Sequence, residues 1–321
     1  MVNYVFDLVQ HAEQNGGSND LGGILKARPF QLFYADVKEE IANYIASEGL
    51  RDAVNVSMAT GRPLLLTGEP GTGKTTAATW MSGIFGLNAA RFQVKSNSRA
   101  QDLLYTFDAV AYFRESQMAA AGGRPSPSKG EFVQKGPLWQ AIEDAADKPQ
   151  LLLIDEIDKA PRDFPNDLLH ELDRMEIFCA EQGKTVTLKD KALRPVIVIT
   201  SNSERRLPEP FLRRCIYHNI VLDQKMLERI VDGRLKQTKT YFEAEPTFRA
   251  AATKCFFALR DNDNLQKKPS VDEFWQWLAF VGSSNAAARA KVIQIASGGR
   301  FSELPSLSAL VKLSEDRAQL P

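Results

Sequence analysis

Residues 63–75, PLLLTGEPGTGKT, join a short apolar run to a glycine-rich loop that ends in lysine and threonine. An unbroken apolar run of this length is typical of a strand that is buried on both faces of a parallel sheet. The loop is followed by apolar residues at helical spacing, namely Ala77, Trp80, Met81 and Ile84. The stretch therefore predicts a strand, a loop and a helix in succession, as at the start of an α/β domain.

The loop between this strand and helix has the pattern G-x-x-x-x-G-K-T, which suits phosphate binding. Its glycines allow backbone N–H groups to point at phosphate oxygens, and the positive end of the helix dipole adds to their effect. Lys74 would reach the β- and γ-phosphates of a nucleotide, and Thr75 would give its hydroxyl to Mg²⁺. A glycine-rich turn without a ligand is the alternative, which the flanking strand and helix disfavour. The predicted nucleotide-binding residues are Gly68, Glu69, Pro70, Gly71, Thr72, Gly73, Lys74, Thr75 and Thr76.

A second buried strand is expected over residues 150–154, and it runs directly into the acidic sequence DEID. A carboxylate at the end of a buried strand is costly unless it faces a cation, so Asp155 is predicted to hold Mg²⁺ through water, beside Thr75. Glu156 is then placed to orient or deprotonate the water that attacks the γ-phosphate, which favours hydrolysis over phosphoryl transfer. Taken alone, the acidic run is also typical of a solvated turn.

A third buried strand is expected over residues 195–200, and Asn202 follows it. Its amide group can hydrogen-bond both the attacking water and an oxygen of the γ-phosphate. An asparagine after a strand is more often a turn former, but the order of three strand ends that carry G-K-T, D-E and N favours function. A further strand is expected at residues 90–94.

Residues 207–214, LPEPFLRR, place two adjacent arginines at the end of a short helix. Arg213 and Arg214 cannot easily turn back onto their own nucleotide, but they can reach the γ-phosphate of a neighbouring subunit as an arginine finger. The alternative is a surface pair that binds nearby carboxylates.

The 321-residue chain has 44% hydrophobic residues, with 40 basic and 40 acidic side chains. This composition is typical of a soluble globular chain of about two domains and excludes a fibre or a disulfide scaffold. The absence of net charge disfavours nucleic acid as a partner. The cysteines are predicted to be buried thiols, because Cys179, Cys215 and Cys255 have no paired spacing. With no signal peptide and no apolar run that could span a bilayer, we expect no membrane insertion and a cytoplasmic location.

The predicted strands end before about Asp223, and the residues after it are predicted to be helical. An earlier segment, residues 118–130 (MAAAGGRPSPSKG), has no apolar face and is predicted to be an exposed mobile loop. Residues 1–27 form a glycine-containing arm without a recognisable role. The helices expected after Asp223 cover residues 225–236, 246–259, 270–281 and 285–296.

The order of the motifs resembles that of AAA+ ATPases, and most of all their MoxR-like branch, over about residues 28–282. The sequence GEPGTGKT is similar to the Walker A motif, LLLIDEIDKAP to Walker B, VITSN to the sensor-1 strand and LPEPFLRRC to the arginine-finger box. In this family the last arginine before the next strand usually acts, so Arg214 is the first candidate and Arg213 the second. Residues 130–138 resemble the end of the family's helix-2 insertion, which makes residues 118–130 a candidate pore- or substrate-facing element. Residues 175–194 resemble the hairpin before sensor 1.

The resemblance implies a P-loop NTPase (AAA+) fold with a parallel sheet in a three-layer α/β/α domain, followed by a small all-α lid. The α/β domain would cover residues 28–222, with a flexible insertion around 113–135, and the lid would cover residues 223–321. The implied cofactors are ATP and Mg²⁺, and the implied partners are a homo-oligomeric ring, a hexamer, and a protein with a von Willebrand factor A domain. The expected catalytic residues are Glu156, Asn202, Arg214, Arg213 and Lys74.

The expected activity is hydrolysis of ATP to ADP and phosphate, coupled to remodelling of a partner protein. The alternative is an ATP-gated assembly scaffold or switch with little turnover, which could belong to a bacterial defence system. The sequence departs from the family at the start of the lid helix, where KKPSVDE (residues 267–273) offers no sensor-2 arginine. Ser270 and Glu273 instead predict a capping box for a helix that buries its aromatic face. Tyr44 is expected in the core rather than against adenine.

Overall fold

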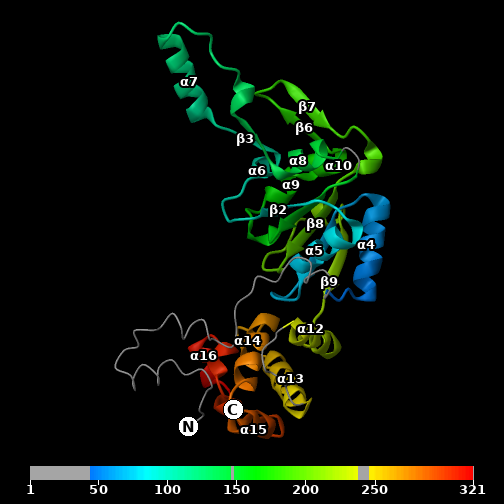
Figure 1. The fold of residues 1–321 in the computed structure, drawn as a ribbon, viewed down its shortest axis with the longest axis vertical. Helices are drawn as coiled ribbons and strands as arrows, with labels where there is room; N and C mark the ends of the chain where they lie inside the picture. Colours follow the sequence, from blue (N-terminus) through cyan, green and yellow to red (C-terminus); the bar gives the residue numbers. More distant parts are fainter. Residues whose placement is uncertain (1–43, 146–147, 238–245, 321) are drawn as a thin grey trace. The chain divides into compact units, whose positions relative to one another are not determined.

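The computed structural model describes residues 44–145, 148–237 and 246–320 (Figure 1). Contacts divide these residues into two compact units. An α/β unit holds residues 44–69 and 73–221, and a helical unit holds residues 222–320 together with 70–72. The predicted arm, residues 1–27, lies outside the described residues.

The centre of the α/β unit is a five-stranded sheet with the strand order β2-β5-β8-β1-β9. Every neighbouring pair in this order is parallel. The strands expected at residues 63–67, 90–94, 150–154 and 195–200 are confirmed, each within one residue of its predicted position. The observed bounds are Leu64–Gly68 for β1, Ala89–Gln93 for β2, Leu151–Asp155 for β5, Val196–Ser201 for β8 and Ile216–Ile220 for β9.

Successive side chains of a buried strand point to opposite faces of the sheet. Both faces are therefore apolar, and helices cover both of them. Leu65 packs into one apolar core with Trp139, whereas Leu64 and Leu66 pack into a second core with Met81. The predicted α/β/α layers are therefore confirmed. The layers include α4 (Glu48–Thr60), α5 (Lys74–Phe85), α8 (Pro137–Glu143), α9 (Phe164–Asp167) and α10 (Leu169–Arg174).

The segment between β2 and β5 is more regular than the sequence suggested. It contains α6 (Ala100–Leu104), the antiparallel pair β3 (Tyr105–Phe107) and β4 (Val133–Lys135), α7 (Ala109–Ala121) and a 3₁₀ turn, Lys129–Phe132. The predicted loop over residues 118–130 is thus wrong at both ends. Figure 1 shows α7 standing apart from the sheet. Asp108 caps the start of α7, and Tyr112 packs against aromatic rings next to the β3–β4 pair, which explains the helix.

The predicted hairpin before β8 is confirmed. Strands β6 (Glu176–Cys179) and β7 (Lys184–Thr187) pair in antiparallel register, and Phe178 lies opposite Thr185. Gly183 has a φ of 59° at the turn, a conformation that glycine adopts at little cost.

The helical unit follows the predicted pattern closely. The capping box at Ser270 and Glu273 is present, and the helix behind it buries Phe274 and Trp277 in an apolar core. The expected helices are confirmed within two residues at each end. They are α12 (Gln224–Gln237), α13 (Pro246–Arg260), α14 (Val271–Gly282) and α15 (Ala286–Ala296), followed by α16 (Ser314–Ala318).

The three cysteines are free and buried, in agreement with the sequence-based prediction. Burial raises the pKa of the Cys215 thiol to about 12 and that of Cys255 to about 11. Among the described residues, no helix is long and apolar enough to cross a membrane.

Asp316 is a fully buried carboxylate in α16 that holds the loop before α14. Its two oxygens accept the backbone N–H groups of Gln266 (2.9 Å) and Lys267 (3.1 Å). We expect Asp316→Ala to lower the local free energy of opening by about 2–3 kcal/mol, because charge-assisted hydrogen bonds are lost. Hydrogen exchange at the two amides measures this loss. Asp316→Asn keeps one acceptor and should lose less, so equal losses in both variants would contradict this role.

Candidate nucleotide site

The loop between β1 and α5 has the backbone of an anion-binding cradle. Gly71 and Gly73 have φ values of 79° and 87°, in the left-handed region that a side chain would strain. Gly73 is the N-cap of the 12-residue helix α5, and no side chain caps this end. The first N–H groups of α5 and the positive end of its dipole are therefore directed at the loop, which suits a phosphate.

Lys74 lies inside this loop, and its side chain is held by the loop backbone. Its ammonium group donates to the carbonyl oxygens of Gly68 and Glu69, both at 2.8 Å. Burial lowers the pKa of Lys74, an effect that the nearby carboxylates oppose, Asp158 first. A phosphate would add the negative charge that best offsets this desolvation.

Thr75 and Asp155 meet where β5 ends beside α5. The Thr75 hydroxyl donates to Asp155 Oδ1 over 3.0 Å, and the hydroxyl of Thr200, at the end of β8, donates to the same oxygen over 2.5 Å. Asp155 is only 2% exposed. A buried carboxylate beside a threonine hydroxyl is the oxygen donor set that Mg²⁺ prefers, so these residues fit the predicted metal.

Arg91 provides the cation that Asp155 contacts in this structure. It lies on β2, next to β5 in the sheet, and its guanidinium donates to Asp155 Oδ2. The Arg91 side chain is 56% exposed, whereas the carboxylate is buried. Sequence reasoning missed Arg91, because a lone arginine in the segment AARFQ carries no motif.

We expect Arg91→Gln to lower the free Mg²⁺ concentration that gives half-maximal ATP turnover by about two- to fivefold, because the guanidinium competes for Asp155. A Mg²⁺ titration at saturating ATP measures this shift. Arg124→Gln, which removes an exposed arginine from a distant loop of the same unit, is the matched control and should show no shift. An unchanged or higher Mg²⁺ requirement in Arg91→Gln would contradict the competition.

Glu156 is fixed by three side chains from different parts of the α/β unit. Its Oε1 accepts from the amide of Asn202 at 3.4 Å, and its Oε2 accepts from Gln93 and Lys159, both at 2.6 Å. Its backbone has a φ of 60°, a rare value for a residue other than glycine, and its N–H donates to Thr200. The predicted pair Glu156 and Asn202 thus lie together, and Gln93 and Lys159 join them.

Asp158 ties the end of β5 to the chain after β8. Its Oδ2 accepts the backbone N–H groups of Asn202 (3.1 Å) and Glu204 (3.0 Å). Its Oδ1 is buried and has no hydrogen-bond partner among the described residues. The position of Asn202 therefore depends on the acidic segment as well as on β8.

The two arginines after α11 (Glu209–Leu212) bind groups of their own chain in this structure. Arg214 Nε lies 2.7 Å from Asp173 Oδ2, and Arg213 Nε lies 3.2 Å from Glu209 Oε1. Both arginine side chains are exposed, at 41% and 76%. These local ion pairs correspond to the alternative considered from the sequence, and exposed pairs of this kind are weak.

Tyr44 is half-buried and packs against the apolar core that contains Trp80, beside the phosphate loop. Its ring centroid lies 5.5 Å from that of Trp80, and its hydroxyl is buried without a hydrogen-bond partner among the described residues. A Cβ added at Gly73 would approach this ring at 3.3 Å. Desolvation raises the pKa of Tyr44.

Comparison with known protein families finds a match over four strands of the central sheet. Residues 63–215 match the AAA domain (dynein-related subfamily). The match spans just under half of the chain. The match covers the strands β1, β2, β5 and β8 and the loops that carry Lys74, Glu156 and Asn202. The match to an AAA domain is evidence for nucleotide binding and for an ATP-driven activity.

Among curated proteins, the chain is 28% identical over 186 residues to the mitochondrial Lon protease homolog of Phaeodactylum tricornutum. The match covers 56% of this chain but 18% of that protein, so the chain spans a small part of its relative. Among solved structures, the Thermotoga maritima RuvB Holliday junction branch migration motor matches with a TM-score of 0.42 and 16% identity, over 81% of this chain and 68% of that chain. A mutant of the same RuvB gives a TM-score of 0.47 at 16% identity, over 79% and 72%.

Proposed function

We propose that this chain is a Mg²⁺-dependent ATPase that converts ATP and water to ADP and phosphate. The observation that carries the proposal is the convergence of three strand ends, at which Thr75 lies 3.0 Å from Asp155 and Asn202 lies 3.4 Å from Glu156. Phosphate-loop, metal-binding and water-binding groups are thereby adjacent, as hydrolysis of a γ-phosphate requires.

Each group has a defined task in this proposal. The loop amides and Lys74 bind the phosphates. Thr75 and Asp155 would hold Mg²⁺, which would supply positive charge to the phosphate oxygens. Glu156 accepts a proton from the attacking water, and Asn202 orients that water. Lys159 and Gln93 both donate to Glu156 Oε2, so the proton is accepted at Oε1, which receives the longer bond of 3.4 Å from Asn202.

The proposal includes a ring of identical subunits, a hexamer, in which Arg214 completes the site of its neighbour. Exposure of the arginine and the weakness of its pair with Asp173 support this role, because little free energy is lost when the pair opens. Hydrolysis would move the lid, residues 223–321, against the α/β domain and so remodel a partner protein, such as one with a von Willebrand factor A domain. Arg213 is the second candidate for the finger.

An ATP-gated scaffold with little turnover is the second candidate function. The contact that favours it is the Lys159 hydrogen bond at 2.6 Å, because an ammonium group on Oε2 makes the Glu156 carboxylate a weaker base. ATP turnover measured against protein concentration separates the two functions. The ATPase predicts a rate per subunit that rises as subunits assemble, whereas the scaffold predicts assembly with ATP and a rate that stays near zero.

A further inference from the structure

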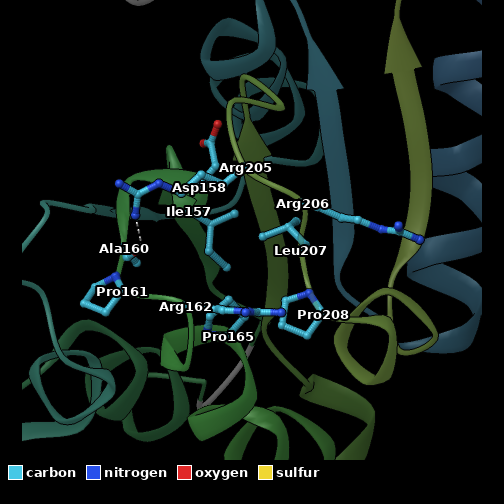
Figure 2. A pocket seen from close by; sticks show the side chains of 10 residues that line it. All are labelled: Ile157, Asp158, Ala160, Pro161, Arg162, Pro165, Arg205, Arg206, Leu207 and Pro208. Carbon is cyan, nitrogen blue, oxygen red and sulfur yellow. Dashed lines mark hydrogen bonds between the residues drawn. The ribbon is translucent and has the colours of Figure 1, made fainter.

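The segments that follow β5 and β8 enclose a pocket of about 330 Å³ in the α/β unit (Figure 2). Its interior is apolar, because Ile157 and Leu207 point toward one another and Pro161, Pro165 and Pro208 lie around them. The volume falls in the range that accommodates a side chain or a small ligand. The residues that line it include none of the predicted nucleotide-binding or catalytic residues, so it is a separate site.

Three arginines line this pocket, and Arg162 and Arg205 form its cationic rim. Arg162 extends between Pro165 and Pro208, and Arg205 reaches across to the carbonyl oxygen of Ala160, at 3.2 Å (Figure 2). Both are exposed, and neither has a carboxylate partner within residues 44–145, 148–237 and 246–320. Exposed guanidinium groups without a carboxylate are free to bind an incoming one.

The same pocket is connected to the catalytic strand ends through Asp158. This residue lines the pocket, and its carboxylate holds the N–H groups of Asn202 and Glu204. One pocket wall is the turn that starts next to Glu156, and the opposite wall continues from Asn202. A ligand in the pocket would therefore touch both segments that position the predicted water-binding groups.

We infer that this pocket binds a short acidic segment of a partner protein. One apolar side chain of the segment packs in the space lined by Leu207 and Pro208, and flanking carboxylates bind Arg162 and Arg205. Charge complementarity favours an acidic ligand, and the apolar interior favours a peptide side chain over a free anion. No aromatic ring lines the pocket among the described residues, so it offers no stacking platform for a nucleic-acid base. The inference rests on the proposed function in one respect, that the bound segment belongs to the remodelled protein.

The test uses a fluorescein-labelled peptide, Asp-Glu-Asp-Leu-Asp-Glu-Asp, and the full chain in a polarisation titration. We expect binding that weakens with salt, and a loss of about two- to fivefold in affinity for Arg162→Gln and for Arg205→Gln. Arg124→Gln is the control, because Arg124 is an exposed arginine of the same unit that does not line the pocket. Serine in place of the peptide leucine should weaken binding about tenfold, since burial of the leucine side chain is lost.

Several results would overturn the inference: no binding, an equal loss in Arg124→Gln, or equal binding of a peptide with lysines in place of the acidic residues. Displacement of the peptide by a single-stranded oligonucleotide of the same charge would instead indicate nucleic acid. The titration is repeated with Glu156→Gln, because polarisation reports peptide binding and requires no ATP turnover. Peptide binding by a wild-type chain that shows no ATP turnover would leave this inference intact and contradict the proposed function. ATP turnover by a wild-type chain that does not bind the peptide would do the opposite.

Discussion

Replacing Glu156 with glutamine is expected to lower the ATP turnover number by about 10²- to 10⁴-fold, the usual contribution of a general base. Glutamine has the same size, and its amide oxygen can still accept from Gln93 and Lys159, which lie 2.6 Å from Glu156 Oε2. It cannot accept a proton from water at neutral pH. ATP affinity should therefore change by less than about twofold, because the phosphates are bound elsewhere. Phosphate release measures turnover, and calorimetry measures binding.

The control for this substitution is Glu204→Gln, the same chemical change at an exposed residue of the loop after β8. Only the backbone N–H of Glu204 contacts Asp158, so the variant keeps that hydrogen bond and should turn over ATP normally. Normal turnover by Glu156→Gln would show that another group activates the water.

Replacing Arg214 with alanine is expected to lower ATP turnover in the assembled protein by about 10³-fold or more, the range known for arginine fingers. Within its own subunit, Arg214 Nε lies 2.7 Å from Asp173 Oδ2, and its guanidinium also donates to the carbonyl oxygen of Pro210 at 2.9 Å. An exposed pair contributes about 0.2–1 kcal/mol, far less than the stabilisation of a transition state by a finger. ATP binding by isolated subunits should remain unchanged.

Arg213→Ala is the matched control for the second prediction, because Arg213 is the adjacent arginine and is paired with Glu209 on its own helix. It should keep most of the activity. Loss of turnover in Arg213→Ala with normal turnover in Arg214→Ala would show that Arg213 is the arginine finger. Normal turnover in both variants would contradict an arginine finger in this segment.

The sheet and the strand-end residues were predictable because their signals are local. The run before Gly68 is apolar on both faces, and Asp155 follows another such run, so each pattern fixes a strand and its end. Parallel strands bring such ends to one edge of the sheet, which places Asp155, Glu156 and Asn202 together. The capping box at Ser270 is local in the same sense and was recognised for that reason.

The side chains that surround Glu156 and Asp155 were not predictable, because their positions depend on pairing between distant segments. Gln93 lies beside Asp155 in the register of β2 with β5, more than fifty residues away in sequence. Nothing in AARFQ indicates that its arginine and glutamine contact two carboxylates. The helix α7 was missed in part for a related reason, since Tyr112 packs on residues from two segments, Phe107 and Phe132, that lie on either side of it.

The most direct test of the central claim, that ATP is hydrolysed between subunits, is to mix the two inactive variants Glu156→Gln and Arg214→Ala. An interface that joins a site with Glu156 to a neighbour with Arg214 has every predicted catalytic group. With random mixing, about a quarter of the interfaces of a head-to-tail ring are of this kind. We predict that the equimolar mixture recovers about this share of wild-type turnover, although each variant alone is inactive. A mixture that is no more active than either variant alone would contradict catalysis shared between subunits.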